Sequence, residues 1–595
     1  MKDSCFMKYV QVKHPRILLM SVAALILFAK NIYFHAITFG VFPEFSSGMG
    51  LTILKFYIAK LLCPIFLSFI LLISYRTIWM TACMFLADLL CIANVIYFKS
   101  YDMFLTINSI TLVGNMDGAW TSLEAYLDAR LLQFPFLTVL WIILSYKINL
   151  PSTRNIKALS IGIGILFLTT YLNNIFIYDY TDACGVTKLH SSTGIPFTFK
   201  KYCRFPFMGI AMHSMDNRRY VYEQSILSYF PSSVASSCKE KYKGVPKITP
   251  NDFKIISPLV SKTDIGVPTP SNSIIIILVE SLESWVLHTN MDGVEITPFL
   301  NRLTCQNNVL YCNKIKSQAL AGNSGDGQMI INTGLLPTTN GVACMDYDSN
   351  IYPNIAGLYS ESATINPWPH IWNQTTMCKR YGYCNLVEPK NTDDNWQDAD
   401  VLTAGREMIS RTHSSFCLMN ITISSHTPFD RIQNNFPISS KTPELLRKYM
   451  SCINYTDKCI EEFFASLNDS ILYNTTIVIT GDHTIFKPAM LNDYKEYAIS
   501  HKLSIANEES YCPLIICSPY IDGNFRVDDI CYQMDIFPTM LHLIDCGDYY
   551  WHGLGVNILD ENARQNRGLI EQEAYRISDL MIRNDYFRKR MSKEL

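Results

Sequence analysis

The sequence has few charged residues and no excess of either sign. Charged side chains make up 17% of its 595 residues, whereas soluble domains average about 25%. Lys and Arg number 50 against 52 Asp and Glu, so the formal net charge is only −2. A nucleic-acid-binding protein would show a basic excess, and a disordered scaffold would lack the 49% of hydrophobic residues found here. Both classes are excluded, and the chain is too long for one ordinary domain.

The cysteine spacing typical of zinc domains is also missing. None of the 19 cysteines belongs to a CxxC…CxxC pattern, which argues against a structural cysteine–zinc site. The close pairs Cys305/Cys312 and Cys378/Cys384 are candidates for local disulfides if this part of the chain lies outside the cytoplasm.

Long apolar runs are concentrated in the first 180 residues. A bilayer core needs about 20 apolar residues of helix, with a range of roughly 17–25. Five runs approach or reach this length, at 16–38, 52–75, 77–98, 131–147 and 157–178. The sequence therefore predicts about five transmembrane helices, with four or six as alternatives. The first run is too long for a cleavable signal peptide, so we expect it to remain as an anchor.

Positive charges gather in alternate loops of this half, which predicts its orientation. Lys2, Lys8, Lys13 and Arg16 precede the first run, and the loop before the fifth run carries basic residues without an acid. Basic loops stay on the cytoplasmic side, so we expect a multi-pass protein of the cell membrane with a cytoplasmic N-terminus and with everything after about residue 180 outside. Residues 99–130 are amphipathic, and Trp120 and Tyr126 suit the depth of lipid headgroups.

The rest of the chain alternates between strand and helix patterns. We expect a transmembrane domain over 1–180, a Ser- and Pro-containing linker over 181–271, a soluble domain over 272–560 and a charged helical tail over 561–595. Apolar runs bounded by turns predict buried strands, and we list them as 273–281, 416–423, 475–483 and 513–519. A helical pattern lies at 444–467. Strands alternating with helices predict an α/β fold with a mostly parallel sheet.

Chemically capable side chains follow three of these strands. Glu280 ends the first, His426 follows the second, and Asp482 and His483 end the third. Ligands of α/β sheets bind at the carboxyl ends of the strands, and mixed oxygen and nitrogen donors suit a divalent metal. Taken singly, a carboxylate at a strand end is usually a helix cap or an ion-pair partner, and a lone histidine is usually structural. Their convergence on one edge favours a metal site.

Ser324 is a candidate nucleophile. It stands among small residues in AGNSGDGQ (321–328), before an apolar helical pattern. A serine at the start of a helix is commonly only a cap. The alternative is a metal-activated nucleophile, placed where backbone N–H groups favour an anionic phosphoryl adduct.

Together these segments resemble the lipoteichoic acid synthase group of the alkaline phosphatase/sulfatase superfamily. The matching stretches are VESLESW (279–285), MDGVEITPFLNRL (291–303), AGNSGDGQ (321–328), LPTTNG (336–341), WNQ (372–374), SSHTPF (424–429), TGDH (480–483) and QMDIFPTMLHL (533–543). The five-span N-terminal half also matches, so the resemblance covers nearly the whole chain. It implies that 272–560 is a catalytic, sulfatase-like domain.

The resemblance implies roles for the candidate residues. Glu280, Asp482 and His483, completed by Ser324, are expected to hold one divalent ion, typically Mn²⁺ in this group, with Zn²⁺ or Mg²⁺ as alternatives. His426 matches the active-site histidine that contacts or protonates the phosphate ester. Substrate contacts are expected from Trp372, Gln374, His426 and Asp326.

Two positions depart from the family pattern. Ser324 replaces the usual threonine, which the chemistry tolerates because both supply a hydroxyl. Gln374 stands where the family commonly has an arginine that binds the phosphate, so the identity of the headgroup is open.

The implied activity is transfer of a glycerol phosphate-like headgroup from a membrane phospholipid, with phosphatidylglycerol favoured, to a glycan or glycolipid through a phospho-Ser intermediate. Phosphoethanolamine transfer to lipid A or a surface glycan, and sulfatase-like hydrolysis, are the alternatives. A formylglycine sulfatase is disfavoured because no Cys or Ser followed by x-Pro-x-Arg occurs in the chain. A catalytically dead receptor is disfavoured because every metal position and the hydroxyl are present.

Overall fold

The computed structural model describes residues 14–40, 50–73, 76–101, 103–107, 109, 127–146, 148, 221, 225–230, 233–234, 244–261, 268–339, 341–390, 395–433, 436–486, 494–507 and 510–592. The chain divides into two compact units. The first comprises residues 1–110 and 126–243, and the second comprises 111–125 and 244–595. We call them the membrane unit and the α/β unit.

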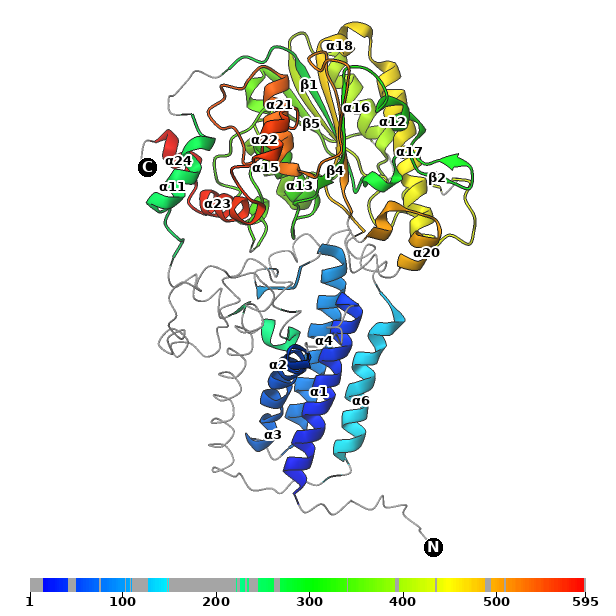
Figure 1. Ribbon diagram of the computed structural model, residues 1–595, viewed down its shortest axis with the longest axis vertical. Helices are drawn as coiled ribbons and strands as arrows, with labels where there is room; N and C mark the ends of the chain where they lie inside the picture. Colours follow the sequence, from blue (N-terminus) through cyan, green and yellow to red (C-terminus); the bar gives the residue numbers. More distant parts are fainter. Residues whose placement is uncertain are drawn as a thin grey trace. The chain divides into compact units, whose positions relative to one another are not determined.

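The membrane unit is a group of apolar helices (Figure 1). They are α1 (Pro15–Phe39), α2 (Gly50–Ser68), α3 (Ile70–Ile73), α4 (Ile78–Tyr101), the 3₁₀ turn η2 (Ala129–Leu132) and α6 (Gln133–Tyr146). Among the described residues, three helical segments are long and apolar enough to cross a membrane: Pro15–Phe39, Ile78–Ser100 and Ala129–Tyr146. Phe56–Ser68 is a shorter apolar helix.

These three segments coincide with the first, third and fourth predicted runs. The fifth run, Trp120, Tyr126 and most of the expected linker lie outside the described residues. The count of five spans therefore stays a prediction.

A polar cluster lies inside the membrane unit. The ammonium of Lys30 in α1 is fully buried and donates hydrogen bonds to Asp88 in α4 and Thr138 in α6. The indole of Trp141 in α6 donates to Thr81 in α4 at 3.0 Å. Hydrogen bonds as well as apolar contacts therefore connect the three long helices.

The α/β unit is built on one nine-stranded sheet with the order β10-β4-β9-β8-β1-β7-β5-β6, and β11 also pairs with β4. Its strands are β1 (Ser273–Val279), β4 (Val309–Lys316), β5 (Glu361–Ile365), β6 (Asn385–Val387), β7 (Phe416–Ile421), β8 (Thr475–Gly481), β9 (Cys512–Cys517), β10 (Asn524–Val527) and β11 (Cys531–Tyr532). A separate hairpin joins β2 (Asn290–Met291) to β3 (Val294–Glu295).

The sheet is mixed but mostly parallel. β1 pairs in parallel with β7 and β8, and β5 pairs in parallel with β6 and β7. Every residue of β1, β7 and β8 is buried, as expected for strands covered on both faces. β9, the last strand expected from the sequence, runs antiparallel to its neighbours β8 and β4.

Helices cover both faces of the sheet (Figure 1). On one side α16 (Asp398–Ser410) packs with α17 (Glu444–Ser466), and α12 (Pro298–Leu303) packs with α17. On the other, α13 (Ser324–Thr333) packs with α21 (Ile536–Leu543). The shorter helices are α11 (Pro250–Ile256), α14 (Ala343–Asp346), α15 (Gln374–Arg380), α18 (Asp469–Tyr473) and α20 (Lys495–Ser500).

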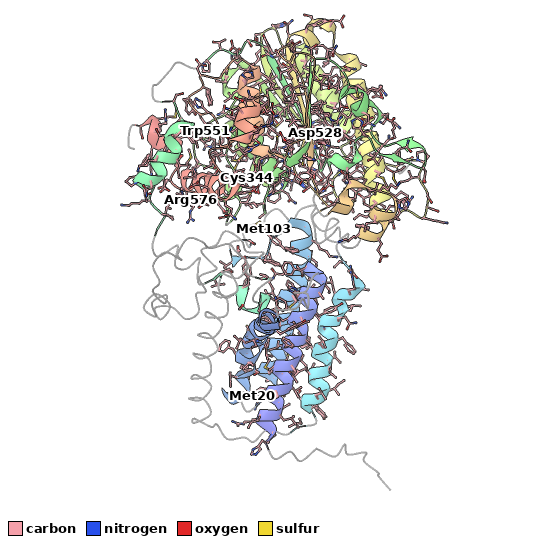
Figure 2. The ribbon with its side chains drawn as sticks, viewed as in Figure 1. Met20, Met103, Cys344, Asp528, Trp551 and Arg576 are labelled. Carbon is pink, nitrogen blue, oxygen red and sulfur yellow. The ribbon has the colours of Figure 1, made fainter. Side chains whose placement is uncertain are left out.

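The last described residues form α22 (Glu561–Gln565), α23 (Glu571–Arg583) and α24 (Tyr586–Met591). Arg576 of α23 pairs with Asp252 of α11 at 2.6 Å, and Figure 2 labels this arginine. The hydroxyl of Ser578 donates to the carbonyl of Leu336 at 2.6 Å. Helix α23 is thus attached to the segment that follows α13.

The two cysteine pairs proposed as local disulfides do not form in the structure. Cys305, Cys312, Cys378 and Cys384 are all free thiols. Cys312 and Cys378 are buried, whereas Cys305 and Cys384 are exposed, so proximity in sequence does not place the members of each pair in the same environment.

Candidate active site

The central strands bring three metal-ligating side chains together. In the parallel pair β1–β8, Val279 lies opposite Gly481, so Glu280 and Asp482 emerge side by side from the carboxyl edge of the sheet. His483 follows directly. One donor atom from each of the three side chains lies within 4.8 Å of the other two, and all three residues are buried. The unit therefore contains a Glu/Asp/His cluster that can hold a metal ion.

Hydrogen bonds orient two of these side chains toward a common point. Nδ1 of His483 donates to the carbonyl of Thr484 at 3.2 Å, and Nε2 lies 3.3 Å from Glu280 Oε1, so Nε2 is the ring atom that would bind an ion. Asp482 Oδ1 accepts the backbone N–H groups of Ser281 and His483, each at 2.8 Å. Asp482 Oδ2 is buried and accepts no hydrogen bond in the described structure. Such an orphaned oxygen beside a carboxylate and an imidazole fits a cation.

The electrostatics lead to the same conclusion. Burial, and next the negative charge of Glu280, raise the pKa of Asp482. Burial alone would also raise the pKa of Glu280, but the hydrogen bond and charge of His483 outweigh burial and lower it. Two adjacent buried carboxylates repel each other, and a divalent cation between them would allow both to be ionised.

Ser324 reaches this cluster from the other side. It is the first residue of α13, and its hydroxyl donates to Glu280 Oε2 at 2.9 Å. The N-terminus of a helix is the positive end of its dipole and stabilises anions. The predicted nucleophile is therefore next to one metal-ligating carboxylate and at an end of a helix that favours phosphate.

The start of α13 is held in place by its own motif. Asp326 Oδ2 accepts the backbone N–H groups of Leu320 and Gly322, each at 2.9 Å, and this fixes the loop before Ser324. A methyl group on Gly327 would overlap the backbone carbonyl of Asp482. Asp326, expected as a substrate contact, thus braces the loop, and Gly327 lets the helix backbone approach the end of β8.

His426 lies in a turn that is bonded to the end of β1. The hydroxyl of Ser425 donates to the carbonyl of Glu280 at 2.6 Å. Nδ1 of His426 donates to the carbonyl of Thr427 at 2.8 Å, so Nε2 is free for a substrate. Burial lowers the pKa of His426, with Glu280 opposing, and this favours the neutral imidazole at neutral pH.

The other two predicted substrate residues lie near the start of α13. A Cβ placed on Gly325 would be 2.9 Å from Cβ of Trp372, so the tryptophan adjoins the turn that carries Ser324. Cys344, labelled in Figure 2, also borders Gly325. Gln374 is buried, and its amide nitrogen donates to the carbonyl of Trp372 at 3.0 Å. This glutamine fixes the tryptophan backbone.

Several supporting residues were not predicted from the sequence. Glu283 Oε1 accepts the N–H groups of Ile485 and Phe486, each at 2.7 Å, and so holds the loop after His483. Gln533 donates to the carbonyl of Asp482 at 2.7 Å. Both lie in stretches that match the family, VESLESW and QMDIFPTMLHL, and this position is the signal that could have identified them.

Asp398, at the start of α16, holds the turn that carries His426. One carboxylate oxygen accepts the N–H groups of Ile423 and Ser424, at 2.7 and 2.8 Å, and the other accepts the hydroxyl of Thr456 at 2.6 Å. No pattern around residue 398 predicts this function, because the contact depends on how α16 packs beside β7.

The sheet and the metal-ligating cluster at its carboxyl edge agree with the expected likeness to the alkaline phosphatase/sulfatase superfamily. The model of the sulfatase family matches residues 272–546, so this part of the chain is a sulfatase-family domain.

Within the superfamily the chain is similar to lipoteichoic acid synthases. It is 24% identical to lipoteichoic acid synthase 2 of Bacillus subtilis (strain 168) over 501 residues, which is 79% of this chain and 72% of that protein. It is 22% identical to the lipoteichoic acid synthase of Staphylococcus aureus (strain USA300) over 509 residues, 79% and 73% of the two chains.

A solved structure extends the likeness to the fold of nearly the whole chain. The integral membrane protein lipooligosaccharide phosphoethanolamine transferase A from Neisseria meningitidis aligns with a TM-score of 0.51 at 14% identity. The alignment covers 90% of this chain and 95% of that one.

Proposed function

We propose that this chain is a metal-dependent phosphotransferase that moves a glycerol phosphate-like headgroup from a membrane phospholipid to a glycan or lipid acceptor outside the cytoplasm. The observation that carries the proposal is the hydrogen bond from Ser324 to Glu280, made at the N-terminus of a ten-residue helix beside Asp482 and His483. The similarity to proteins named lipoteichoic acid synthases supports this class of activity. We take phosphatidylglycerol as the proposed donor.

The residues that would hold the ion are Glu280, Asp482, His483 and Ser324. The resemblance favours Mn²⁺, with Zn²⁺ and Mg²⁺ as alternatives. When bound, a divalent ion supplies a lower pKa for the serine hydroxyl and neutralises charge on the phosphoryl oxygens.

Ser324 is the proposed nucleophile. Its Oγ forms a bond to phosphorus while the bond between phosphorus and the diacylglycerol oxygen breaks, giving a phosphodiester on Ser324. Across this step the serine proton ends on the diacylglycerol oxygen, and His426, neutral with Nε2 free, is the candidate carrier. An acceptor hydroxyl then attacks the same phosphorus and returns a proton to Ser324.

The proposed membrane arrangement has five spans, a cytoplasmic N-terminus and the α/β unit outside the cytoplasm. The three described spans and the charge pattern of the N-terminal loops support it. This arrangement would give Ser324 lipid donors and surface acceptors in the same compartment.

The test uses the full chain purified in detergent, loaded with Mn²⁺ and mixed with headgroup-labelled phosphatidylglycerol or phosphatidylethanolamine in the absence of an acceptor. We expect the label from phosphatidylglycerol on the peptide containing Ser324, detected by mass spectrometry. Ser324→Ala should lose the label, and Ser324→Thr should keep it.

Ser281→Ala is the matched control, because Ser281 also donates to Glu280, at 2.9 Å, but from the end of β1. It should still form the adduct. If only phosphatidylethanolamine transfers its label, the donor is phosphatidylethanolamine and not phosphatidylglycerol. Donor hydrolysis without any adduct, or normal turnover by Ser324→Ala, would overturn the proposal.

A further inference from the structure

A cationic side chain that the sequence did not single out lies beside His426. Arg431 follows the SSHTPF stretch, and its guanidinium carbon is 4.2 Å from the centroid of the Trp368 ring. The same tryptophan meets the His426 ring at a centroid distance of 5.6 Å, in an edge-on arrangement. Arg431, Trp368 and His426 therefore form a continuous stack, which we call the Arg431 stack.

The backbone of Arg431 is fixed by the segment that precedes α16. Its carbonyl accepts hydrogen bonds from the side-chain amides of Asn395 at 3.4 Å and Gln397 at 3.2 Å. Gln397 in turn accepts the hydroxyl of Tyr455 at 2.9 Å. The guanidinium is thus presented by an anchored turn, and stacking on Trp368 removes much of its remaining freedom.

The charge of Arg431 is available for a ligand. The side chain is half-buried and lies over Trp368, and the carboxylate that acts most strongly on it is its exposed neighbour Asp430. It acts electrostatically on His426 and is itself influenced by Glu280, so it lies in the field of the active site. Gln374, which the family resemblance places at the phosphate, is uncharged and donates to the backbone of Trp372.

We propose that Arg431, held on Trp368 beside His426, binds the anionic oxygens of the donor phosphodiester and supplies the positive charge that Gln374 lacks. The inference rests on the proposed function. A guanidinium presents paired N–H donors that match two phosphoryl oxygens, and the ring of Trp368 leaves its edge free to donate them. Arg431 would thereby determine affinity for a phosphate-containing donor.

Two variants and a matched control test this inference on the full Mn²⁺-loaded chain. We expect Arg431→Gln to raise the phosphatidylglycerol concentration that gives half-maximal labelling of Ser324 by about tenfold or more, since a charge-assisted hydrogen bond is lost. Arg431→Lys keeps the charge without the planar fork and should show a smaller rise. Arg526→Gln is the control, because Arg526 lies over the Tyr311 ring, at 5.3 Å, on the strand at the far edge of the sheet. It should match the wild type.

Binding of inorganic phosphate, measured by calorimetry, separates this inference from the proposed function. Arg431→Gln should weaken phosphate binding by a similar factor, with metal content and melting temperature unchanged. If the wild type forms no adduct with either lipid, the proposed function fails, and phosphate binding still decides the role of Arg431. Equal phosphate affinity in wild type and Arg431→Gln would overturn the inference. So would a labelling defect of Arg431→Gln that appears only with the chain in phosphatidylglycerol-containing vesicles and not in detergent, since that would indicate a membrane contact instead.

Discussion

Asp482 uses its two carboxylate oxygens for different purposes. Oδ1 accepts two backbone N–H groups, which fix the side chain, and Oδ2 is left buried without a hydrogen bond. Leaving a buried oxygen unpaired costs free energy unless a ligand satisfies it. The cost is accounted for if this oxygen is a metal ligand.

This division of roles makes Asp482→Asn informative. The amide oxygen can still accept both backbone N–H groups, but the substitution removes the charge that would hold the ion. Loss of a residue that hydrogen-bonds to a metal ligand already weakens metal binding by about 10–100-fold, so loss of a ligand itself should weaken it by at least about 100-fold. We expect Mn²⁺ and adduct formation to be lost together, as measured by elemental analysis and by labelling of Ser324.

Asp457→Asn is the control for that variant. Asp457 in α17 is also buried, and it accepts the N–H groups of Phe299 and Leu300 at the start of α12, away from the metal cluster. It should lower the melting temperature while metal content persists. Full metal occupancy in Asp482→Asn would contradict the assignment.

At the scale of elements, the site depends on how closely α13 approaches β8. Gly327 packs its backbone against the carbonyl of Asp482. We expect Gly327→Ala to displace the helix, cost about 1–3 kcal/mol of stability as overpacking does, and separate Ser324 from the metal cluster. The amount of Ser324 adduct should fall by more than the loss of folded protein, judged from the melting temperature, would explain.

Gly547→Ala is the matched control, since open space surrounds the position of its added methyl group. It should change neither the melting temperature nor the amount of Ser324 adduct. A Gly327→Ala protein with normal labelling would show that α13 does not need this close approach.

The sequence predicted those elements whose signal is local. The runs at 273–281, 416–423 and 475–483 correspond to β1, β7 and β8, and 444–467 to α17, within two residues at each end. The side chains at their ends are those that converge in the structure. The strands of the large sheet that were missed are β5 and β6, which are short and partly polar, and β4, β10 and β11, whose pairing depends on distant partners.

Other features could not be predicted because they are tertiary. The reversed direction of β9 is set by its neighbours β8 and β4, and no residue of the run at 513–519 specifies it. The sequence did not predict a role for Arg431, because the residue is positioned by Trp368, which lies 63 residues away in the chain.

At the scale of the whole molecule, the membrane unit depends on a buried charge pair. Lys30 and Asp88 are both buried, and Thr138 from a third helix bonds to each of them. Ionisable residues inside membrane segments are costly unless they are paired. The three helices are therefore expected to assemble as a set.

A double-mutant comparison checks this expectation. Asp88→Leu alone leaves the Lys30 ammonium buried without its counter-charge, and breaking such a pair costs about 3–5 kcal/mol. Replacing both partners, as Lys30→Met with Asp88→Leu, should be nearly neutral. We expect a low yield and melting temperature of the detergent-purified chain for the single variant and recovery for the double variant. Equal yields and melting temperatures of the single and double variants would show that the membrane unit does not depend on the pair.

The register between β1 and β8 has a consequence for when the ion is acquired. Glu280 and Asp482 become neighbours only through a strand pair whose members are separated by most of the α/β unit. A nascent chain that lacks β8 has one carboxylate and no binding site. Metal capture must then follow closure of the sheet, so the ion would be taken from the compartment in which this unit finishes folding. The metal content of the mature protein would consequently record the supply in that compartment.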